Sequence, residues 1–208
     1  MAEQVRTISL RRSVFADNDR EAEALRQSLR QRGLLLVNVM SSPGAGKTSA
    51  LVALIRRLTP ALRVGVMEAD IDSDVDAVAV AEKTGCRAVQ LHTGGMCHLD
   101  AGMTGQGLAS LGMDGLDLVF LENVGNLVCP AEYDTGAHLN MTILSVPEGD
   151  DKPLKYPLMY EKCGLVLVSK IDTLPYFPFR LDVCRENIRL RNPDAQILPL
   201  LSLIHISE

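Results

Sequence analysis

The apolar residues of the chain form short segments that follow two different periodicities. Leu34 to Met40 is a nearly continuous apolar run, which is typical of a strand buried on both faces of a sheet. The segment from Asp19 to Arg32 instead repeats its apolar residues at helical spacing, and Gly33 follows as a helix stop signal. The pattern therefore predicts a helix that leads directly into a buried strand.

The same alternation of patterns continues to the end of the chain. Apolar runs predict further strands at residues 63–68, 87–91, 116–122, 141–146, 164–169 and 196–200. Helical spacing predicts helices at residues 50–58, 73–83 and 181–190. Alternating units of this kind imply a three-layer α/β fold, with a mostly parallel sheet and helices on both faces. No repeat or linker divides the sequence, so we expect a single domain over residues 1–208.

The turn after the first strand is rich in small residues and contains Gly-Lys-Thr. It reads Ser41-Ser42-Pro43-Gly44-Ala45-Gly46-Lys47-Thr48-Ser49 and lies between a predicted strand and a predicted helix. That is the context of a Walker A loop, whose backbone N–H groups and helix N-terminus surround a phosphate chain. We expect Lys47 to reach the β- and γ-phosphates and the Thr48 hydroxyl to bind Mg²⁺, so the fold class is that of the P-loop NTPases. Ser41 replaces the first glycine of the motif.

Carboxylates stand at the ends of two predicted strands. Asp70 follows one of them, and Glu122 ends another and is followed by Gly125, which is the Walker B arrangement. In an open α/β sheet, ligands bind beyond the carboxyl ends of the strands, and carboxylate oxygens suit Mg²⁺. We therefore expect Asp70 and Glu122 to serve catalysis together with Lys47, and to hold Mg²⁺ together with Thr48.

A later strand pattern leads into the sequence Ser169-Lys170-Ile171-Asp172. GTPases carry Asn-Lys-x-Asp at this place, where the aspartate accepts two hydrogen bonds from guanine and the lysine stem covers the base plane. Adenine does not offer that pair of donors, so Asp172 and Lys170 predict a preference for GTP over ATP. Ser169 in place of asparagine is expected to loosen the bracing of this loop.

The composition mainly excludes classes of function and location. The formal net charge is -5 and no basic block is present, so nothing indicates binding to nucleic acid. No run of roughly eighteen apolar residues could form a transmembrane helix, and the N-terminus lacks the apolar core of a signal peptide. The five cysteines form no Cys-x-x-Cys pair, and their odd number favours reduced thiols. We expect a cytoplasmic protein that binds neither nucleic acid nor membranes.

Two segments carry side chains that suit a soft metal. Cys97 and His98 are adjacent, and Cys129 lies shortly after Glu122. Cysteine and histidine together favour Zn²⁺ or Ni²⁺. Three ligands do not close a tetrahedral site, so a second subunit or water would have to supply the rest. On the residues alone, two buried cysteines and a hydrogen-bonded histidine are the interpretation that composition favours.

Five segments taken together resemble one known family. They are SSPGAGKT, CHLDA, LENVGNLVCP, PEGDDKPLKYP and SKIDTLPY, and the resemblance runs from about Val14 to about Leu200. The family is that of HypB, the nickel-incorporation GTPase of hydrogenase maturation. The resemblance implies a homodimer that is promoted by GTP, with Mg²⁺ at the phosphates and Ni²⁺ or Zn²⁺ at the subunit interface.

The resemblance also implies roles for individual residues and for partners. Cys97, His98 and Cys129 would bind nickel or zinc, Asp76 would join the nucleotide site, and the two guanine-reading residues keep their role. The function implied is hydrolysis of GTP to GDP, coupled to nickel delivery into a [NiFe] hydrogenase; we expect it to be slow and Mg²⁺-dependent. The partners implied are the hydrogenase large-subunit precursor and other maturation proteins.

The chain departs from the family pattern in places, and two other functions stay open. Gly102 lies where some members carry a further histidine, so a fourth ligand from there is lost. Residues 201–208 do not continue the pattern, and we expect them to be a non-native tail. One alternative is a urease-type nickel-insertion GTPase, against which the adjacent Cys97 and His98 argue. The other is a metal-binding or partner-docking module with little catalysis.

Overall fold

The strands of the chain form one parallel sheet. In chain order they are β1 Leu35–Ser41, β2 Val64–Asp70, β3 Arg87–His92, β4 Leu118–Glu122, β5 Leu139–Ser145, β6 Leu165–Ser169 and β7 Gln196–Pro199. The computed structural model describes residues 10–70 and 75–201, and in that part the strand order is β3-β2-β4-β1-β5-β6-β7. Every neighbouring pair in this order is parallel. The predicted α/β fold with a parallel sheet is confirmed.

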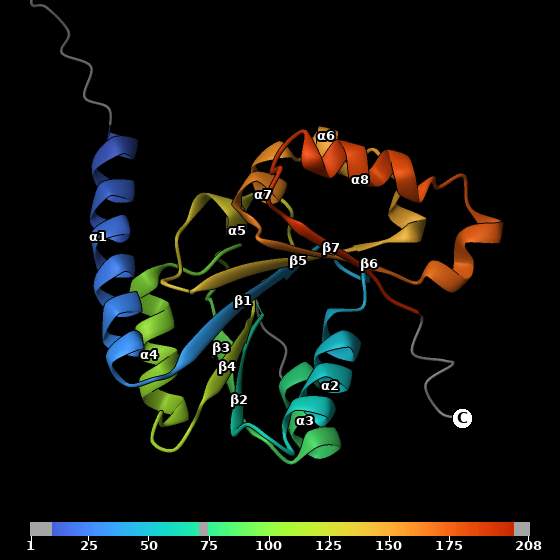
Figure 1. Ribbon diagram of the computed structural model, residues 1–208. Helices are drawn as coiled ribbons and strands as arrows, with labels where there is room; N and C mark the ends of the chain where they lie inside the picture. Colours follow the sequence, from blue (N-terminus) through green and yellow to red (C-terminus); the bar gives the residue numbers. More distant parts are fainter. Residues whose placement is uncertain (1–9, 71–74, 202–208) are drawn as a thin grey trace, which may run out of the picture.

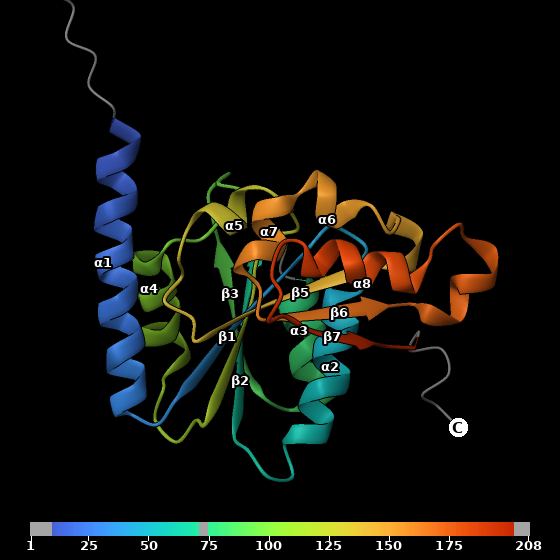
Figure 2. The same cartoon turned by 45° about the horizontal axis from the view of Figure 1, so that its top comes forward.

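Helices cover both faces of this sheet (Figures 1 and 2). In chain order they are α1 Leu10–Gln31, α2 Lys47–Leu58, α3 Val75–Thr84, α4 Ala101–Leu111, α5 Cys129–Glu132, α6 Lys152–Lys155, α7 Pro157–Lys162 and α8 Leu181–Arg189, with 3-10 segments η1 Val146–Glu148 and η2 Ile171–Tyr176. Helices α2 and α3 pack on one face, whereas α1, α4, α7 and α8 pack on the other. This is the predicted three-layer architecture.

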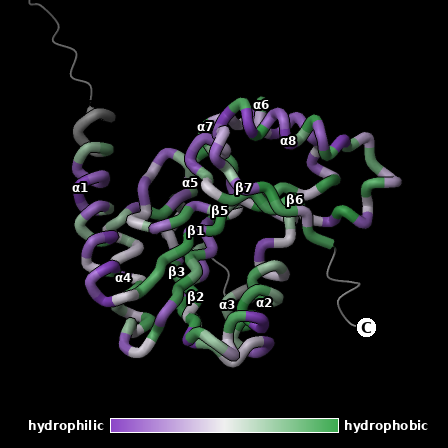
Figure 3. The backbone as a smooth tube through the Cα atoms, in the orientation of Figure 1, coloured by the Kyte–Doolittle hydropathy of each residue, from purple (hydrophilic) through white to green (hydrophobic). Residues whose placement is uncertain are grey.

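Side chains alternate along the strands, so each face of the sheet has its own core. On β1, Val37 and Val39 belong to one cluster with Leu51 and Ile55 of α2. Leu36 of the same strand belongs to the cluster on the opposite face. In Figure 3 the interior strands are largely hydrophobic, whereas the outer helices α1 and α8 contain hydrophilic stretches. Burial on both faces explains why the central strands appear in the sequence as continuous apolar runs.

Helix α4 is an element that the hydrophobic pattern did not predict. Its sequence contains Gly102, Gly105 and Gly107, and glycine lowers helix propensity. Packing compensates, because a Cβ atom on Gly107 would lie 2.9 Å from the side chains of Leu91 and Met67. The helix therefore approaches the sheet at a distance that only glycine allows, and the residue that weakens the sequence signal is required by the fold.

The remaining boundaries differ little from the predictions, except at the ends of the chain. Helix α1 begins at Leu10 rather than Asp19, and in the added part Phe15 packs near Tyr133 and Asn18 bonds to Asp134. Of the expected tail at 201–208, Leu201 is exposed and the rest lies outside the described residues. Among the described helices, none has the length and hydropathy needed to cross a membrane.

Candidate functional site

The loop between β1 and α2 has a backbone shaped for phosphate. Gly46 has a φ of 93°, in the left-handed region that residues with a side chain rarely adopt, and it immediately precedes the first residue of α2. The first N–H groups of a helix have no partner within the helix, and here they open into the crevice beyond β1. The segment from Gly46 to Ser49 therefore presents backbone N–H donors at a helix N-terminus.

Side chains from two distant segments brace this loop from outside. The Ser169 hydroxyl donates to the carbonyl of Ala45 at 2.9 Å, and the Lys170 Nζ donates to the carbonyl of Gly44 at 2.9 Å. On the other side, the Ser42 hydroxyl donates to the carboxylate of Glu148. Ser169, which stands where GTPases carry asparagine, thus makes a direct bond to the phosphate loop.

A cavity of about 510 Å³ lies in front of the loop and collects most of the predicted polar residues. It is lined by Pro43, Gly44, Gly46, Lys47, Thr48, Ser49, Glu68, Ala69, Asp70, Glu122, Asn123, Val124 and Gly125. Within it the Thr48 hydroxyl donates to Glu122 Oε1 at 3.0 Å. The structure thus brings Lys47, Thr48, Asp70 and Glu122 together, as their positions at strand and helix ends predicted. The side chain of Asp76 lies outside the described part of the chain.

Glu68 is a member of this cavity that the sequence analysis did not assign. It is 3% exposed and pairs in register with Glu122, which is 1% exposed, on the neighbouring strand. Two buried carboxyl groups side by side favour a bound cation or a shared proton, since like charges repel strongly at low dielectric. Carboxylate and hydroxyl oxygens are the ligands that Mg²⁺ prefers, so these residues fit that ion. The available signal was a glutamate interrupting an otherwise apolar strand.

A second cavity of about 560 Å³ adjoins the first. It is lined by Ala45, Gly46, Ser49, Ala50, Ala53, Leu54, Arg57, Ser169, Lys170, Ile171, Pro199, Leu200 and Leu201. Gly46 and Ser49 line both cavities, so the two lie against the same start of α2. The first cavity is polar and lies at the helix N-terminus, whereas the second has mainly apolar walls, which suit a planar base. Asp172 follows directly in η2, where it is half-buried.

The predicted metal ligands lie on the two loops that follow the carboxyl ends of β3 and β4. Cys97 Sγ lies 3.9 Å from His98 Nδ1 in the β3–α4 connection, and the Cys129 thiol at the start of α5 is hydrogen-bonded to Cys97. Asn126 Nδ2 donates to Cys129 Sγ at 3.7 Å. Among the described residues, no group of three histidine, cysteine or acidic side chains converges closely enough to hold a metal ion. Cys97 therefore pairs with each of the other two, but the three do not form a closed site within the chain.

Burial sets the protonation of these side chains. It lowers the pKa of His98, opposed by the carboxylates of Asp100 and Glu132, so the imidazole stays neutral. The hydrogen bond with Cys97, together with burial, raises the pKa of the Cys129 thiol. The His98 ring also stacks on Tyr133, with centroids 3.8 Å apart and planes at 8°. A neutral imidazole can bind a metal as it stands, whereas the thiol must first lose its proton.

The comparison with protein families now defines the class. The family described as CobW/HypB/UreG, nucleotide-binding domain, matches residues 35–199, which include the phosphate loop, both carboxylate-bearing strands and both thiol-bearing loops. The hydrogenase maturation factor HypB of Rhizobium leguminosarum bv. viciae is 42% identical over 195 residues, covering 94% of this chain and 65% of the relative. The hydrogenase/urease maturation factor HypB of Helicobacter hepaticus is 42% identical over 187 residues, covering 88% and 76%.

A solved structure agrees with these relatives. The crystal structure of HypB from Helicobacter pylori in complex with nickel superposes with a TM-score of 0.82 at 38% identity, covering 89% of this chain and 86% of that one. The chain therefore belongs to the HypB family of hydrogenase maturation factors. It spans slightly less than two thirds of the length of the Rhizobium relative.

Proposed function

We propose that the chain is a GTP-hydrolysing metallochaperone that delivers nickel during [NiFe] hydrogenase maturation, and that residues 1–208 act as one GTPase domain. The observation that carries the proposal is the course of the chain after β4. Glu122 ends this strand in the phosphate cavity, and the same loop runs on to Cys129 at the start of α5. A change at the γ-phosphate can thus reach a thiol through one short connection. The nickel complex of the Helicobacter pylori relative supports the choice of metal.

In the proposed reaction a water molecule attacks the γ-phosphate in line, and the chain supplies position and charge. Lys47 at the start of α2 meets the β- and γ-phosphates, while the backbone from Pro43 to Ser49 holds the phosphate chain. Bound Mg²⁺, held by Thr48, Asp70 and Glu122, would supply the positive charge that such a transfer requires. Asp70 and Glu122 orient the attacking water, and hydrolysis is slow because no arginine finger is expected from this chain.

Base selection in the proposal rests on Lys170, which lines the second cavity, and on Asp172, which follows it in η2. Asp172 accepts hydrogen bonds from the guanine N1–H and 2-amino groups, and the stem of Lys170 covers the base. The bonds from Ser169 and Lys170 to the phosphate loop support this assignment, because they fix the base-reading segment to the loop that holds the phosphates. GTP is therefore the proposed substrate rather than ATP.

Nickel is the proposed cargo, with zinc as a competing metal. Cys97, His98 and Cys129 supply at most three ligands, so two chains related by a two-fold axis would complete the site. We propose a cytoplasmic homodimer that GTP promotes, which hands its metal to the hydrogenase large-subunit precursor with other maturation proteins. The five free thiols are in keeping with a reducing compartment.

Phosphate release from GTP and from ATP, with Mg²⁺ and with excess chelator, tests the proposed activity. We expect release from GTP only, and only with Mg²⁺. Asp172→Asn should shift the preference towards xanthosine triphosphate, whose base offers the complementary pattern, whereas Asp182→Asn on the exposed face of α8 should not. No phosphate release together with intact nickel binding would instead support a metal-binding module with little catalysis.

One observation favours a second recipient of the nickel, urease. The Helicobacter hepaticus relative is named a hydrogenase/urease maturation factor. Nickel-loaded chain offered to apo-urease and to the hydrogenase large-subunit precursor in parallel would show which of the two acquires metal.

A further inference from the structure

Asn18 of α1 connects the two loops that carry the thiols. Its side chain is 7% exposed. The Nδ2 group donates to the carbonyl of Asp134 at 3.0 Å, and Oδ1 accepts the backbone N–H of Ala101 at 2.9 Å. Ala101 begins α4 directly after the segment with Cys97 and His98, and Asp134 follows the short helix that Cys129 opens. A single buried amide therefore bonds to both segments.

Two further contacts of α1 reach the segment that carries Cys129. The ring of Phe15 lies 5.0 Å from that of Tyr133, which in turn stacks on His98 at 3.8 Å. Arg26 Nη2 donates to both carboxylate oxygens of Asp134 at 2.7 Å. Contacts of α1 with this segment thus lie on both sides of Asn18 along the helix.

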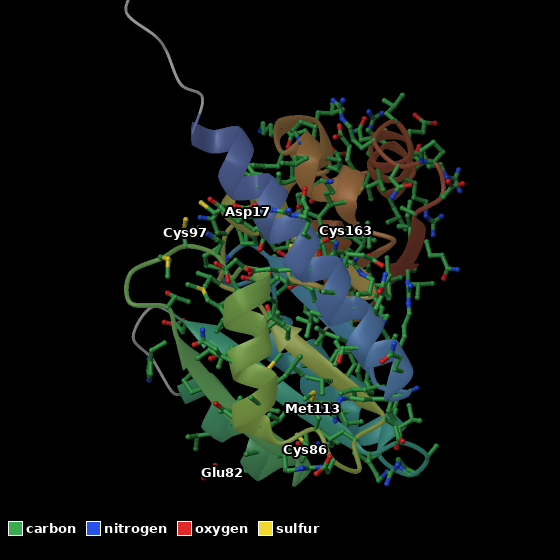
Figure 4. All side chains as sticks on the ribbon, turned by 90° about the vertical axis from the view of Figure 1, so that its left-hand side faces the viewer. Asp17, Glu82, Cys86, Cys97, Met113 and Cys163 are labelled. Carbon is green, nitrogen blue, oxygen red and sulfur yellow. The ribbon has the colours of Figure 1, made fainter. Side chains whose placement is uncertain are left out.

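The placement is visible when the molecule is viewed from the side of α1. Figure 4 shows α1 and α4 side by side, with Cys97 on the loop at the upper end of α4. The label of Asp17, the residue before Asn18, lies at the same level of α1. The described contacts of α1 with the thiol-bearing loops are therefore made by the middle part of the helix.

The chemistry of this connection calls for an amide. The N–H of Ala101 lies in the first turn of α4 and has no partner within that helix, while Asp100 caps only the N–H of Met103, at 2.8 Å. An asparagine side chain offers one acceptor and a separate donor, so it serves a backbone N–H and a backbone carbonyl at once. An aspartate keeps the acceptor but loses the donor, and an alanine loses both.

We propose that Asn18 is a positioning residue of the metal site, which fixes the spacing between the Cys97–His98 loop and the Cys129 loop before metal binds. The proposal rests on the proposed function, in which these three side chains bind nickel. Metal–ligand bonds tolerate little variation in length, so a site whose loops are held at the right spacing binds more tightly than one that must first be ordered. Outer groups that orient metal ligands typically contribute roughly 10–100-fold to affinity.

The experiment compares Asn18→Ala with a matched control, Asn192→Ala. Asn192 also makes a donor and an acceptor bond to backbone, with Cys163 at 2.9 Å and Asp194 at 3.1 Å, but neither partner belongs to the loops that carry Cys97, His98 and Cys129. Ni²⁺ affinity is measured by equilibrium dialysis and by the nickel–thiolate charge-transfer absorption, and GDP affinity and thermal unfolding are measured on the same samples. We expect Asn18→Ala to weaken Ni²⁺ binding by roughly tenfold or more, with unchanged GDP affinity. Asn192→Ala should leave both affinities unchanged.

The outcomes separate this proposal from the proposed function. Equal Ni²⁺ affinity in Asn18→Ala and wild type would overturn the positioning role while leaving the metal site in place. A wild-type chain that binds no Ni²⁺ would overturn both. If Asn18→Ala does not fold, Asn18→Asp decides: a partial loss of Ni²⁺ affinity is expected from the lost bond to Asp134, and an unchanged affinity contradicts the role.

Discussion

The phosphate loop is shaped by consecutive residues, whereas the thiol-bearing loops depend on a third element packed against them. From Ser41 to Thr48 the chain makes its own concave backbone, and its braces come from the ends of neighbouring strands. Cys97 and Cys129 instead stand on separate connections, and α1 bonds to both of those connections through Asn18. A site built locally can be recognised in the sequence, while one built from distant contacts can be recognised only in the fold.

The difference also predicts how each site responds to change. In the phosphate loop most ligand-facing groups are backbone N–H groups, which substitution does not remove. In the thiol site every proposed ligand is a side chain, so one substitution removes a large share of the binding. The predictions below test whether the two sites are separable, beginning with the largest expected effect.

Cys129→Ala should remove most nickel binding while leaving GDP affinity within about twofold of wild type, because the thiolate is one of only three proposed ligands. Metal stoichiometry by equilibrium dialysis and nucleotide affinity by calorimetry are the measurements. Cys86→Ala is the control, since that half-buried thiol is bonded to Thr84 away from the site. A variant that loses stability yet keeps its nickel would mean that Cys129 only fills the core.

Lys47→Ala should produce the reverse result. Loss of the ammonium group that we propose to meet the phosphates is expected to weaken GDP and GTP binding tenfold or more, which is about 1.4 kcal/mol or above. Nickel stoichiometry without nucleotide should not change. Lys162→Ala, an exposed lysine on α7, is the charge-matched control. Unchanged nucleotide affinity by calorimetry would remove Lys47 from the site.

Glu148→Gln should have a smaller effect on the same site. The carboxylate accepts from the Ser42 hydroxyl with one oxygen, and with the other from the Ser145 N–H at 2.8 Å and hydroxyl at 2.7 Å. Glutamine offers only one acceptor oxygen and carries no charge, so Ser42 or Ser145 loses its bond to a charged carboxylate oxygen. We expect about a fivefold loss of GDP affinity, near 1 kcal/mol, with no change in nickel. Glu186→Gln on α8 is the control, and equal GDP affinities in the two variants would contradict the brace.

His138→Asn should change the pH dependence of folding stability without affecting either site. Burial and the charges of Arg30 and Arg26 lower the pKa of His138 below 6.5, and its Nδ1 accepts the N–H of Leu36 at 3.1 Å. The unfolded chain then binds the proton more readily than the folded chain. The stabilising contribution of neutral His138 should therefore be fully present above about pH 6.5, and the free energy of unfolding should fall as the pH drops below that value. Asparagine keeps an acceptor but does not titrate.

The contribution of His138 is expected to be less than about 1 kcal/mol, because the ring is only half-buried. Urea unfolding of wild type and variant at about pH 7.5 and pH 5.5 measures it, with the exposed His92→Asn as control. Burial lowers the pKa of His98 as well, so only the difference between wild type and variant isolates His138. Parallel pH profiles for the two proteins would contradict the prediction.

The sequence predicted those parts of the molecule whose signals are local. The strands appeared as apolar runs because the sheet is covered on both faces, and the Gly-Lys-Thr turn lies where the motif requires. Helix α4 was missed because close packing on the sheet selects glycines that weaken a helical pattern. Glu68 was not assigned because its role depends on Glu122 of a neighbouring strand.

Asn18 could not have been identified at all without the fold. Its partners are backbone atoms of Ala101 and Asp134, at sequence separations of 83 and 116 residues. Nothing in the spacing of side chains reports such a contact. The bond between Ser42 and Glu148, at a separation of 106 residues, escaped for the same reason.

Both partners of Asn18 belong to the main chain, so this connection constrains the residue type at position 18 more than at positions 101 and 134. Any residue except proline at position 101 supplies the same N–H, and any residue at position 134 supplies the same carbonyl. Substitutions there can accumulate without breaking the bonds, whereas a substitution at position 18 breaks both together. Among descendants of this sequence, changes at positions 101 and 134 should therefore leave the Asn18 bonds intact, whereas changes at position 18 should be selected against.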